Sequence, residues 1–275
     1  MNLHRRTFLA AAGALTVTPA FADAQSGSKP AMKSKTATFV LVHGGGHGGW
    51  CWQRVARPLR ALGHEVYTPT LTGLGERSHL MTRDTDLDTH INDVVNVLKY
   101  EDLTNVILVG HSYGGMVITG VADRALSRIG HLVFLDAAHP KNGEGLWRED
   151  GPQHPARAQG RIVNGVELIL WPDTPIISAY GVTKPEDLAW MKDKLTPHPW
   201  KSMVQPLRLT NEAAVMRIPR TDIWRPAQGT KLPPDVATKS TRNGQPVWEI
   251  NTGHDMMVTA PKAVIEIFLE VAKLV

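Results

Sequence analysis

The stretch Val106-Ile-Leu-Val-Gly-His-Ser-Tyr-Gly-Gly115 decides the fold of this chain. Its apolar, mostly β-branched beginning predicts a buried strand, and the residues that follow form a G-x-S-x-G turn that opens a helix. In such a turn the serine, here Ser112, is held in strained backbone geometry with its hydroxyl exposed. Gly110 and Gly114 leave room where side chains would clash. The helix N-terminus behind the serine favours developing negative charge, so Ser112 is the predicted nucleophile.

Two further motifs follow other predicted strands, one near each end of the chain. The glycine-rich turn His43–Gly46 comes directly after the apolar run Phe39–Val42. It can aim the Gly45 N–H at a substrate oxygen, and the Tyr113 N–H would be the second donor of this oxyanion hole. His254 follows the last predicted strand, at the edge where catalytic groups collect in open α/β sheets. A serine hydroxyl is a poor nucleophile at neutral pH, and the imidazole of His254 would supply the base that it needs.

Strands and helices alternate along the chain, which predicts an α/β fold with a mostly parallel, doubly wound sheet flanked by helices. The predicted strands are 39–42, 65–68, 106–109, 132–135, 223–224 and 247–250. The predicted helices are 50–62, 87–100, 114–126, 234–239 and 261–274. Between about 140 and 215 the alternation stops, prolines and tryptophans gather, and no clean strand is evident. We interpret this segment as a helical cap inserted into a single domain of residues 37–275.

The first 22 residues indicate a targeting signal rather than part of the fold. The pair Arg5-Arg6, a short apolar run and the ending Ala20-Phe-Ala22 are together typical of a twin-arginine export signal with cleavage before Asp23. Residues 23–36 are small and polar and predict a flexible leader. No later stretch approaches about 18 consecutive apolar residues. We therefore expect a folded protein that is exported to the periplasm or secreted, without stable membrane insertion after the signal is removed.

The composition excludes several other classes of protein. The chain has 275 residues, 42% hydrophobic and 20% charged, with a formal net charge of +4, so it is neither disordered nor strongly basic. No run of Lys or Arg is long enough for a nucleic-acid patch, and we expect no nucleic-acid partner. Cys51 is the only cysteine, which excludes an intrachain disulfide and a cysteine-rich zinc site. His43 and His47 lie in a glycine-rich loop rather than on one helix face, so no metal is expected.

These motifs, in this order and spacing, resemble the α/β-hydrolase superfamily. The segments His43-Gly44-Gly45, Gly110-His-Ser-Tyr-Gly114 and Gly253-His254 carry the resemblance. They are most similar to the branch that contains bacterial carboxylesterases of the pyrethroid-hydrolase type, plant methylesterases and hydroxynitrile lyases. The similarity extends over most of residues 38–272, including Leu135–Pro140 and the segment 181–209. The resemblance implies a Ser-His-acid triad, no cofactor and a cap over the pocket.

The acid of the implied triad departs from the pattern of that branch, in which it usually follows the strand before the last helix–strand unit. The corresponding stretch Ile223–Thr230 holds no carboxylate. Asp222 opens the predicted strand at the wrong end of the sheet, and Asp235 falls in the predicted helix that follows. Asp136 stands at the carboxyl end of the preceding strand, where some other α/β hydrolases, such as certain haloalkane dehalogenases, keep their acid. We predict that Asp136 orients His254, with Asp222 as the alternative.

The resemblance and the serine motif together indicate a serine carboxylesterase that cleaves a hydrophobic or bulky small-molecule ester through an acyl-enzyme intermediate. Four tryptophans of the predicted cap are candidate substrate-binding residues: Trp147, Trp171, Trp190 and Trp200. An apolar pocket would use such side chains, but burial in a small core of the cap's own would use them equally well. Both interpretations stay open at this point.

Other activities on the same framework are alternatives. A lactonase or an amidase would use the same triad, and a hydrolase-like ligand receptor would keep the triad but turn over slowly. Hydroxynitrile lyases of this branch carry Lys after the catalytic histidine and Thr after the first-strand histidine, where this chain has Asp255 and Gly44. Cyanohydrin cleavage is therefore disfavoured. The sequence leaves open the natural ester, its acyl and alcohol groups, the stereopreference and the oligomeric state.

Overall fold

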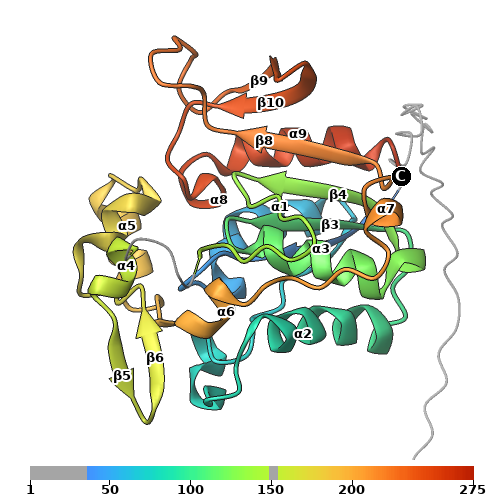
Figure 1. Cartoon of the computed structure of the whole chain (residues 1–275). Helices are drawn as coiled ribbons and strands as arrows, with labels where there is room; N and C mark the ends of the chain where they lie inside the picture. Colours follow the sequence, from blue (N-terminus) through green and yellow to red (C-terminus); the bar gives the residue numbers. More distant parts are fainter. Residues whose placement is uncertain (1–35, 149–153) are drawn as a thin grey trace, which may run out of the picture. The chain divides into compact units, whose positions relative to one another are not determined.

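The central feature of the structure is a seven-stranded sheet with the strand order β2-β1-β3-β4-β8-β10-β9 (Figure 1). The computed structural model describes residues 36–148 and 154–275, so the predicted signal peptide and nearly all of the predicted leader lie outside the described residues. Neighbouring strands run parallel except for the edge pair β10 and β9. The strands are β1 (Thr38–Val42), β2 (Glu65–Tyr67), β3 (Val106–His111), β4 (Ile129–Leu135), β8 (Arg220–Trp224), β9 (Ala237–Arg242) and β10 (Gln245–Ile250). The predicted α/β fold with a mostly parallel sheet is confirmed.

Helices cover both faces of this sheet. Successive side chains of each buried strand point to opposite faces and enter two different apolar layers. In β3, Ile107 and Val109 belong to one layer, whereas Val106 and Leu108 belong to the other. The first layer holds α1 (Gln53–Ala61), α8 (Met256–Thr259) and α9 (Pro261–Ala272), and the second holds α2 (Leu87–Tyr100) and α3 (Gly114–Arg124). Within the described residues, no helix is both long enough and apolar enough to cross a membrane.

The segment before β10 differs from its prediction. The helix predicted over 234–239 is wrong, since residues from Ala237 onward form β9 and pair antiparallel with β10. The turn between them is Asn243-Gly244, and both residues have positive φ, 50° and 75°. Two left-handed residues at the turn favour a two-residue hairpin, for which Asn-Gly is the strongest local signal. Asp235 therefore lies ahead of a strand, with φ of 56°, and not in a helix.

The chain between β4 and β8 starts beyond the carboxyl ends of the parallel strands and ends with a helix near their amino ends, beside the C-terminus (Figure 1). It forms a series of short elements. They are α4 (Pro155–Ala158), β5 (Arg161–Val163), β6 (Val166–Ile169), η4 (Pro175–Tyr180), α5 (Pro185–Lys192), β7 (His198–Pro199), α6 (Trp200–Val204) and α7 (Glu212–Val215). The strands β5, β6 and β7 pair in a small antiparallel sheet, so the expectation that this segment holds no strand is wrong. Three 3₁₀ turns complete the described elements: η1 (Gly49–Trp52), η2 (Gly75–Leu80) and η3 (Leu126–Arg128).

Helix α3 packs closely against the loop after β4, and a substitution at this contact tests the fold. A Cβ added to Gly115 would lie 2.1 Å from the Ala138 carbonyl oxygen, which is backbone and cannot rotate away. We expect Gly115→Ala to lower the free energy of unfolding by about 3 kcal/mol and to impair activity, because the overpacking displaces the start of α3.

The matched control is Gly120→Ala in the same helix. Its Cβ would meet the Cδ1 atom of Ile91 at 2.3 Å, and this side chain can change rotamer. Alanine also has a higher helix propensity than glycine, which offsets part of the cost of moving Ile91. We therefore expect the free energy of unfolding to fall by about 1 kcal/mol or less. Chemical denaturation of both variants measures the difference, and equal losses would contradict this account of the α3 contact.

Candidate active site

Ser112 stands at the sharp turn between β3 and α3. Its φ is +54°, a left-handed conformation that non-glycine residues seldom adopt and that concentrates at functional sites. The turn is tight: a Cβ on Gly110 would lie 2.6 Å from the Gly114 carbonyl oxygen, which explains why side chains are excluded there. The backbone of Ser112 is fixed to the end of β4, because its N–H donates to the Leu135 carbonyl at 3.3 Å and its own carbonyl accepts from the Ala138 N–H at 3.0 Å.

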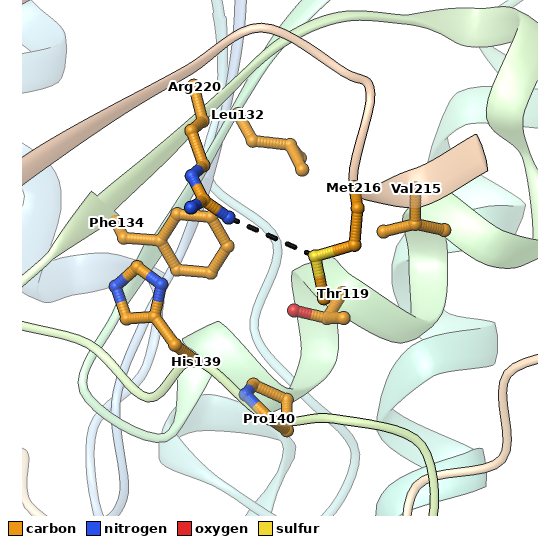
Figure 2. A pocket seen from close by; sticks show the side chains of 8 residues that line it. All are labelled: Thr119, Leu132, Phe134, His139, Pro140, Val215, Met216 and Arg220. Carbon is orange, nitrogen blue, oxygen red and sulfur yellow. Dashed lines mark hydrogen bonds between the residues drawn. The ribbon is translucent and has the colours of Figure 1, made fainter. Parts of the chain in front are cut away.

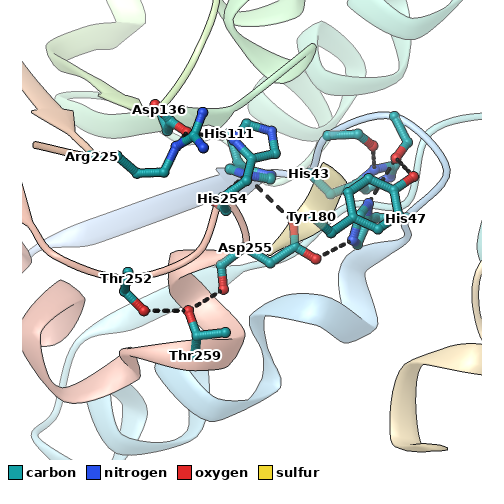
Figure 3. Close-up of polar contacts among 12 residues, drawn as sticks. His43, His47, His111, Asp136, Tyr180, Arg225, Thr252, His254, Asp255 and Thr259 are labelled. Atoms are coloured by element: carbon teal, nitrogen blue, oxygen red, sulfur yellow. Dashed lines mark hydrogen bonds and ion pairs between the residues drawn. The ribbon is translucent and has the colours of Figure 1, made fainter. Parts of the chain in front are cut away.

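A histidine–carboxylate pair lies at the same edge of the sheet. His254 Nδ1 is 2.5 Å from Asp136 Oδ2, and the Asp136 side chain is only 8% exposed (Figure 3). Asp136 follows β4 with a φ of 43°, and its N–H donates to the Ile223 carbonyl at 2.7 Å, which holds the turn against β8. Since a carboxylate accepts, Nδ1 must carry the proton, and Nε2 of the neutral ring is left free to act as a base.

The carboxylate of Asp136 has a second partner. Arg225 Nε donates to the same Oδ2 at 2.6 Å, from a side chain that is half exposed. Burial by itself raises the pKa of Asp136, but the hydrogen bond and charge of His254 and the charge of Arg225 outweigh it, and the pKa is lowered. The carboxylate of Asp136 is therefore ionised while His254 acts as a base.

The loop that carries His254 is joined to the residue before Ser112. The His254 carbonyl accepts a hydrogen bond from His111 Nε2 at 3.0 Å, and the two rings lie 4.6 Å apart between centroids. Three loops from distant parts of the chain thus bring Ser112, Asp136 and His254 to neighbouring positions. Within the described residues the Ser112 hydroxyl makes no hydrogen bond, to His254 or to another group. Hydrogen bonds between a nucleophile and its base are often long without substrate and tighten in the complex.

The glycine-rich turn after β1 lies against the serine. A Cβ added to Gly44 would be 2.9 Å from both the Ser112 Cβ and His111 Nδ1, so the turn packs too closely here for a side chain at position 44. Tyr113 comes directly after Ser112, immediately before the first turn of α3. Among the described residues, neither the Gly45 N–H nor the Tyr113 N–H donates to an acceptor of the protein. Two unengaged amides beside the serine are what an oxyanion hole requires.

Of the four candidate tryptophans, two pack against each other, and basic side chains lie over the rings of three. Trp147 lies 5.6 Å from Trp200 between ring centroids, Trp171 donates to the Leu168 carbonyl at 2.9 Å, and Trp190 packs edge-on against Trp50. The side chains closest to Gly45, in the glycine-rich turn His43–Gly46 that we call the oxyanion turn after its predicted role, are others. A Cβ on Gly45 would meet Leu170 Cδ1 at 2.8 Å and Met203 Cε at 2.9 Å. The wall over Gly45 is therefore aliphatic and comes from the inserted segment.

The alternative acid, Asp222, contacts a different histidine. It is the third residue of β8, and its Oδ1 lies 3.3 Å from His139 Nε2. The His139 ring stacks between Phe134 and Trp224, at 4.1 and 5.3 Å between centroids. His139 also lines a small pocket above α3, shown in Figure 2. The residues of that pocket are Thr119, Leu132, Phe134, His139, Pro140, Val215, Met216 and Arg220.

A buried polar network that was not predicted from the sequence lies beneath the oxyanion turn. His47 was considered only as a metal ligand and Asp255 only as a departure from the lyases, yet His47 Nε2 lies 2.9 Å from Asp255 Oδ2. Tyr180 was not singled out at all, and its hydroxyl donates to the Gly45 carbonyl at 3.2 Å. The available signal was position, since His47 directly follows the glycine-rich turn His43–Gly46 and Asp255 follows His254. In the part of the chain that the structure describes, no group of three or more His, Cys, Asp or Glu residues could hold a metal ion.

Comparison with known proteins identifies the family. Residues 39–267 match the model of the alpha/beta hydrolase family. The chain belongs to this family. A carbendazim hydrolyzing esterase from Nocardioides sp. (strain SG-4G) is 36% identical over 238 residues, which cover 84% of this chain and 97% of that protein. A putative chloroplastic methylesterase from Arabidopsis thaliana is 35% identical over 112 residues, which cover 40% of this chain and 25% of that protein.

Solved structures agree with this assignment. An extracellular alpha/beta-hydrolase from a Paenibacillus species is 28% identical with a TM-score of 0.59, and the match covers 69% of this chain and 77% of that one. A methylesterase from Arabidopsis, at 24% identity and a TM-score of 0.65, shares the fold over 87% of this α/β hydrolase and all of its own chain. The predicted resemblance to the esterase branch is confirmed, and these relatives support a hydrolase that acts on ester bonds.

Matched substitutions distinguish Asp136 from Asp222 as the acid that orients His254. Asp136→Asn should lower kcat for ester hydrolysis by about 10³-fold or more, because an amide facing His254 favours the wrong tautomer of the ring. Asp222→Asn changes the same chemistry in a carboxylate that contacts His139, and kcat should stay within about threefold of wild type. Steady-state kinetics on one chromogenic ester measure both, and wild-type turnover by Asp136→Asn would contradict the role given to this carboxylate.

Proposed function

We propose that this α/β hydrolase is a serine carboxylesterase that hydrolyses a hydrophobic or bulky ester of a small molecule through an acyl-enzyme intermediate. The observation that carries the proposal is the His254 Nδ1–Asp136 Oδ2 hydrogen bond of 2.5 Å, beside a serine with φ of +54° on a strand–helix turn. An oriented imidazole beside a serine hydroxyl is the arrangement that acyl transfer needs. The esterase relatives support the same reaction class.

In the acylation half of the reaction, the substrate carbonyl carbon would lie above Ser112 with its oxygen toward the turn. His254 Nε2 takes the hydroxyl proton as the serine oxygen bonds to that carbon. The tetrahedral oxyanion accepts hydrogen bonds from the Gly45 and Tyr113 amides, and the partial positive charge at the α3 N-terminus adds to its stabilisation. Asp136 stabilises the imidazolium. His254 then protonates the departing alkoxide, which leaves as an alcohol.

In the deacylation half, water replaces the alcohol. His254 removes a proton from the water as its oxygen attacks the acyl carbon, and the same two amides hold the second oxyanion. Collapse of this intermediate breaks the bond to the Ser112 oxygen, which recovers its proton from His254, and the carboxylic acid is released. The residues of the site thereby return to their starting protonation states.

The substrate side of the proposal depends on the inserted segment. Leu170 and Met203 pack over Gly45, so an ester bound with its carbonyl at the oxyanion turn would meet aliphatic side chains. Trp147, Trp171, Trp190 and Trp200 lie in the same segment and are proposed to extend an apolar surface for a bulky group. The proposal includes export of the folded enzyme by the signal in residues 1–22, which stays a prediction from the sequence.

The test is hydrolysis of a panel of chromogenic carboxylic esters by the wild type, Ser112→Ala and His254→Ala. The wild type should show steady-state turnover that increases with the apolar size of the acyl or alcohol group. Each variant should lose about 10⁴-fold or more in kcat, since neither the nucleophile nor its base can be replaced. Unchanged turnover in Ser112→Ala, or a burst of one equivalent without steady-state turnover in the wild type, would contradict the proposal.

A further inference from the structure

Buried side chains fix the peptide unit between Gly45 and Gly46 at both ends. The Gly45 carbonyl accepts hydrogen bonds from His47 Nδ1 at 2.8 Å and from the Tyr180 hydroxyl at 3.2 Å. The Gly46 N–H donates to His198 Nδ1 at 3.3 Å. The three side chains are buried. The proposed oxyanion donor, the Gly45 N–H, belongs to the adjoining peptide plane, whose Gly44 carbonyl accepts from His43 Nδ1 at 2.8 Å. Holding the Gly45–Gly46 plane at both ends restrains the backbone torsions of Gly45, and with them the direction in which this N–H points.

Proton counting defines the state of the His47 ring. Its Nδ1 faces a carbonyl oxygen, which can only accept, and its Nε2 lies 2.9 Å from Asp255 Oδ2 (Figure 3). With Asp255 ionised, both ring nitrogens must carry protons, and the ring is an imidazolium. Burial by itself would lower the pKa of His47, but the charge of Asp255 and the hydrogen bond to it prevail and raise that pKa. The pair is neutral as a whole, which is how a protein accommodates two charged groups away from water.

Asp255 joins the oxyanion turn to the catalytic histidine. It follows His254 directly, yet its side chain has no exposed surface and points toward His47 (Figure 3). Its backbone is fixed too, because its N–H donates to the Tyr180 carbonyl at 3.0 Å and its carbonyl accepts from the Thr259 N–H at 3.0 Å. Asp255 Oδ1 also lies 3.8 Å from His111 Nε2, in the residue before Ser112. One carboxylate thus bonds to the support of the oxyanion donor, belongs to the residue after the base, and lies near the residue before the nucleophile.

We propose, on the basis of the proposed function, that His47 and Asp255 form an ion pair of positioning residues that aims the Gly45 N–H at the oxyanion formed on Ser112. The pair does not contact the reacting atoms. It acts through the Gly45 carbonyl, and it holds the His254 loop against the same turn. Because the oxyanion exists only in the tetrahedral intermediates and develops in the transition states that flank them, the pair contributes to kcat and little to substrate binding.

The experiment replaces the pair by apolar side chains of similar shape, in the double variant His47→Phe and Asp255→Leu. Removing both charges together avoids a buried, unpaired carboxylate. The Gly45 carbonyl then keeps only the Tyr180 hydroxyl, and kcat should fall by about tenfold or more while KM stays within about threefold. Binding of a boronic acid that forms a tetrahedral adduct on Ser112 should weaken by the same factor as kcat/KM, since both report the oxyanion hole.

The matched control is His64→Phe. His64 is also buried, accepts a hydrogen bond from the Ala37 N–H at 3.1 Å, and packs edge-on against Phe39. It directly precedes β2, at the amino edge of the sheet and away from the oxyanion turn. The same substitution there should lower thermal stability and leave kcat and boronic acid affinity unchanged. A merely structural role of His47 and Asp255 predicts this pattern for the double variant as well.

A second measurement covers the case in which the double variant does not fold. Ring ¹⁵N resonances of His47 in the wild type should show two protonated nitrogens, and in Asp255→Asn one of them should lose its proton, with a smaller fall in kcat. The inference is overturned by a wild-type His47 ring with an unprotonated nitrogen, or by a double variant that loses less than about tenfold in kcat or loses only KM. Failure of the proposed function would look different, because Ser112→Ala would then retain wild-type turnover.

Discussion

The hydrogen bond between His254 Nδ1 and Asp136 Oδ2 is the contact on which the proposed chemistry of this site depends. Its two residues are 118 positions apart in the sequence. They meet because β4 and β8 lie side by side and β8 pairs with β10, so that the turns after parallel strands open on one edge of the sheet. The bond fixes the ring tautomer and leaves Nε2 as the only basic atom of His254. The strand order therefore decides which nitrogen can accept a proton.

The protonation of the other buried histidines follows from the groups around them. His43 donates from Nδ1 to the Gly44 carbonyl and accepts at Nε2 from the Leu71 N–H, and burial lowers its pKa to about 3. Burial, followed by the nearby His254, likewise holds the pKa of His111 well below its usual value. His47 differs because a carboxylate faces it. The site thus combines neutral rings that act as fixed donors and acceptors with one proposed imidazolium.

Local signals predicted the parts of the molecule whose geometry is set by a few neighbouring residues. The serine turn needs glycines within two positions of Ser112, and α2 has the predicted bounds because Asp86 and Thr89 form a capping box at its start. Strand β9 was mistaken for a helix because the periodicity of its short, polar segment is ambiguous, although Asn243-Gly244 marked a hairpin. Such errors arise where length and hydrophobicity give little information.

Pairings between distant residues were predictable only where the geometry of a parallel sheet dictated them. Asp136 could be chosen because the carboxyl end of a strand is a defined place, and the structure brings it against His254. The contact between His47 and Asp255 spans 208 positions and depends on how two loops pack, which no periodicity encodes. The same holds for Arg225, which reaches Asp136 from the stretch Ile223–Thr230, where the sequence has no carboxylate.

The most direct test of the central claim is covalent capture of the nucleophile. An organophosphorus ester with a fluoride leaving group should phosphonylate Ser112, forming one O–P bond with release of fluoride, and peptide mapping by mass spectrometry should find the added mass on that residue. The rate should fall in Asp136→Asn by about the same factor as kcat, since both require the oriented base. Modification of a different residue, or an unmodified Ser112 in an enzyme that still hydrolyses esters, would contradict the account.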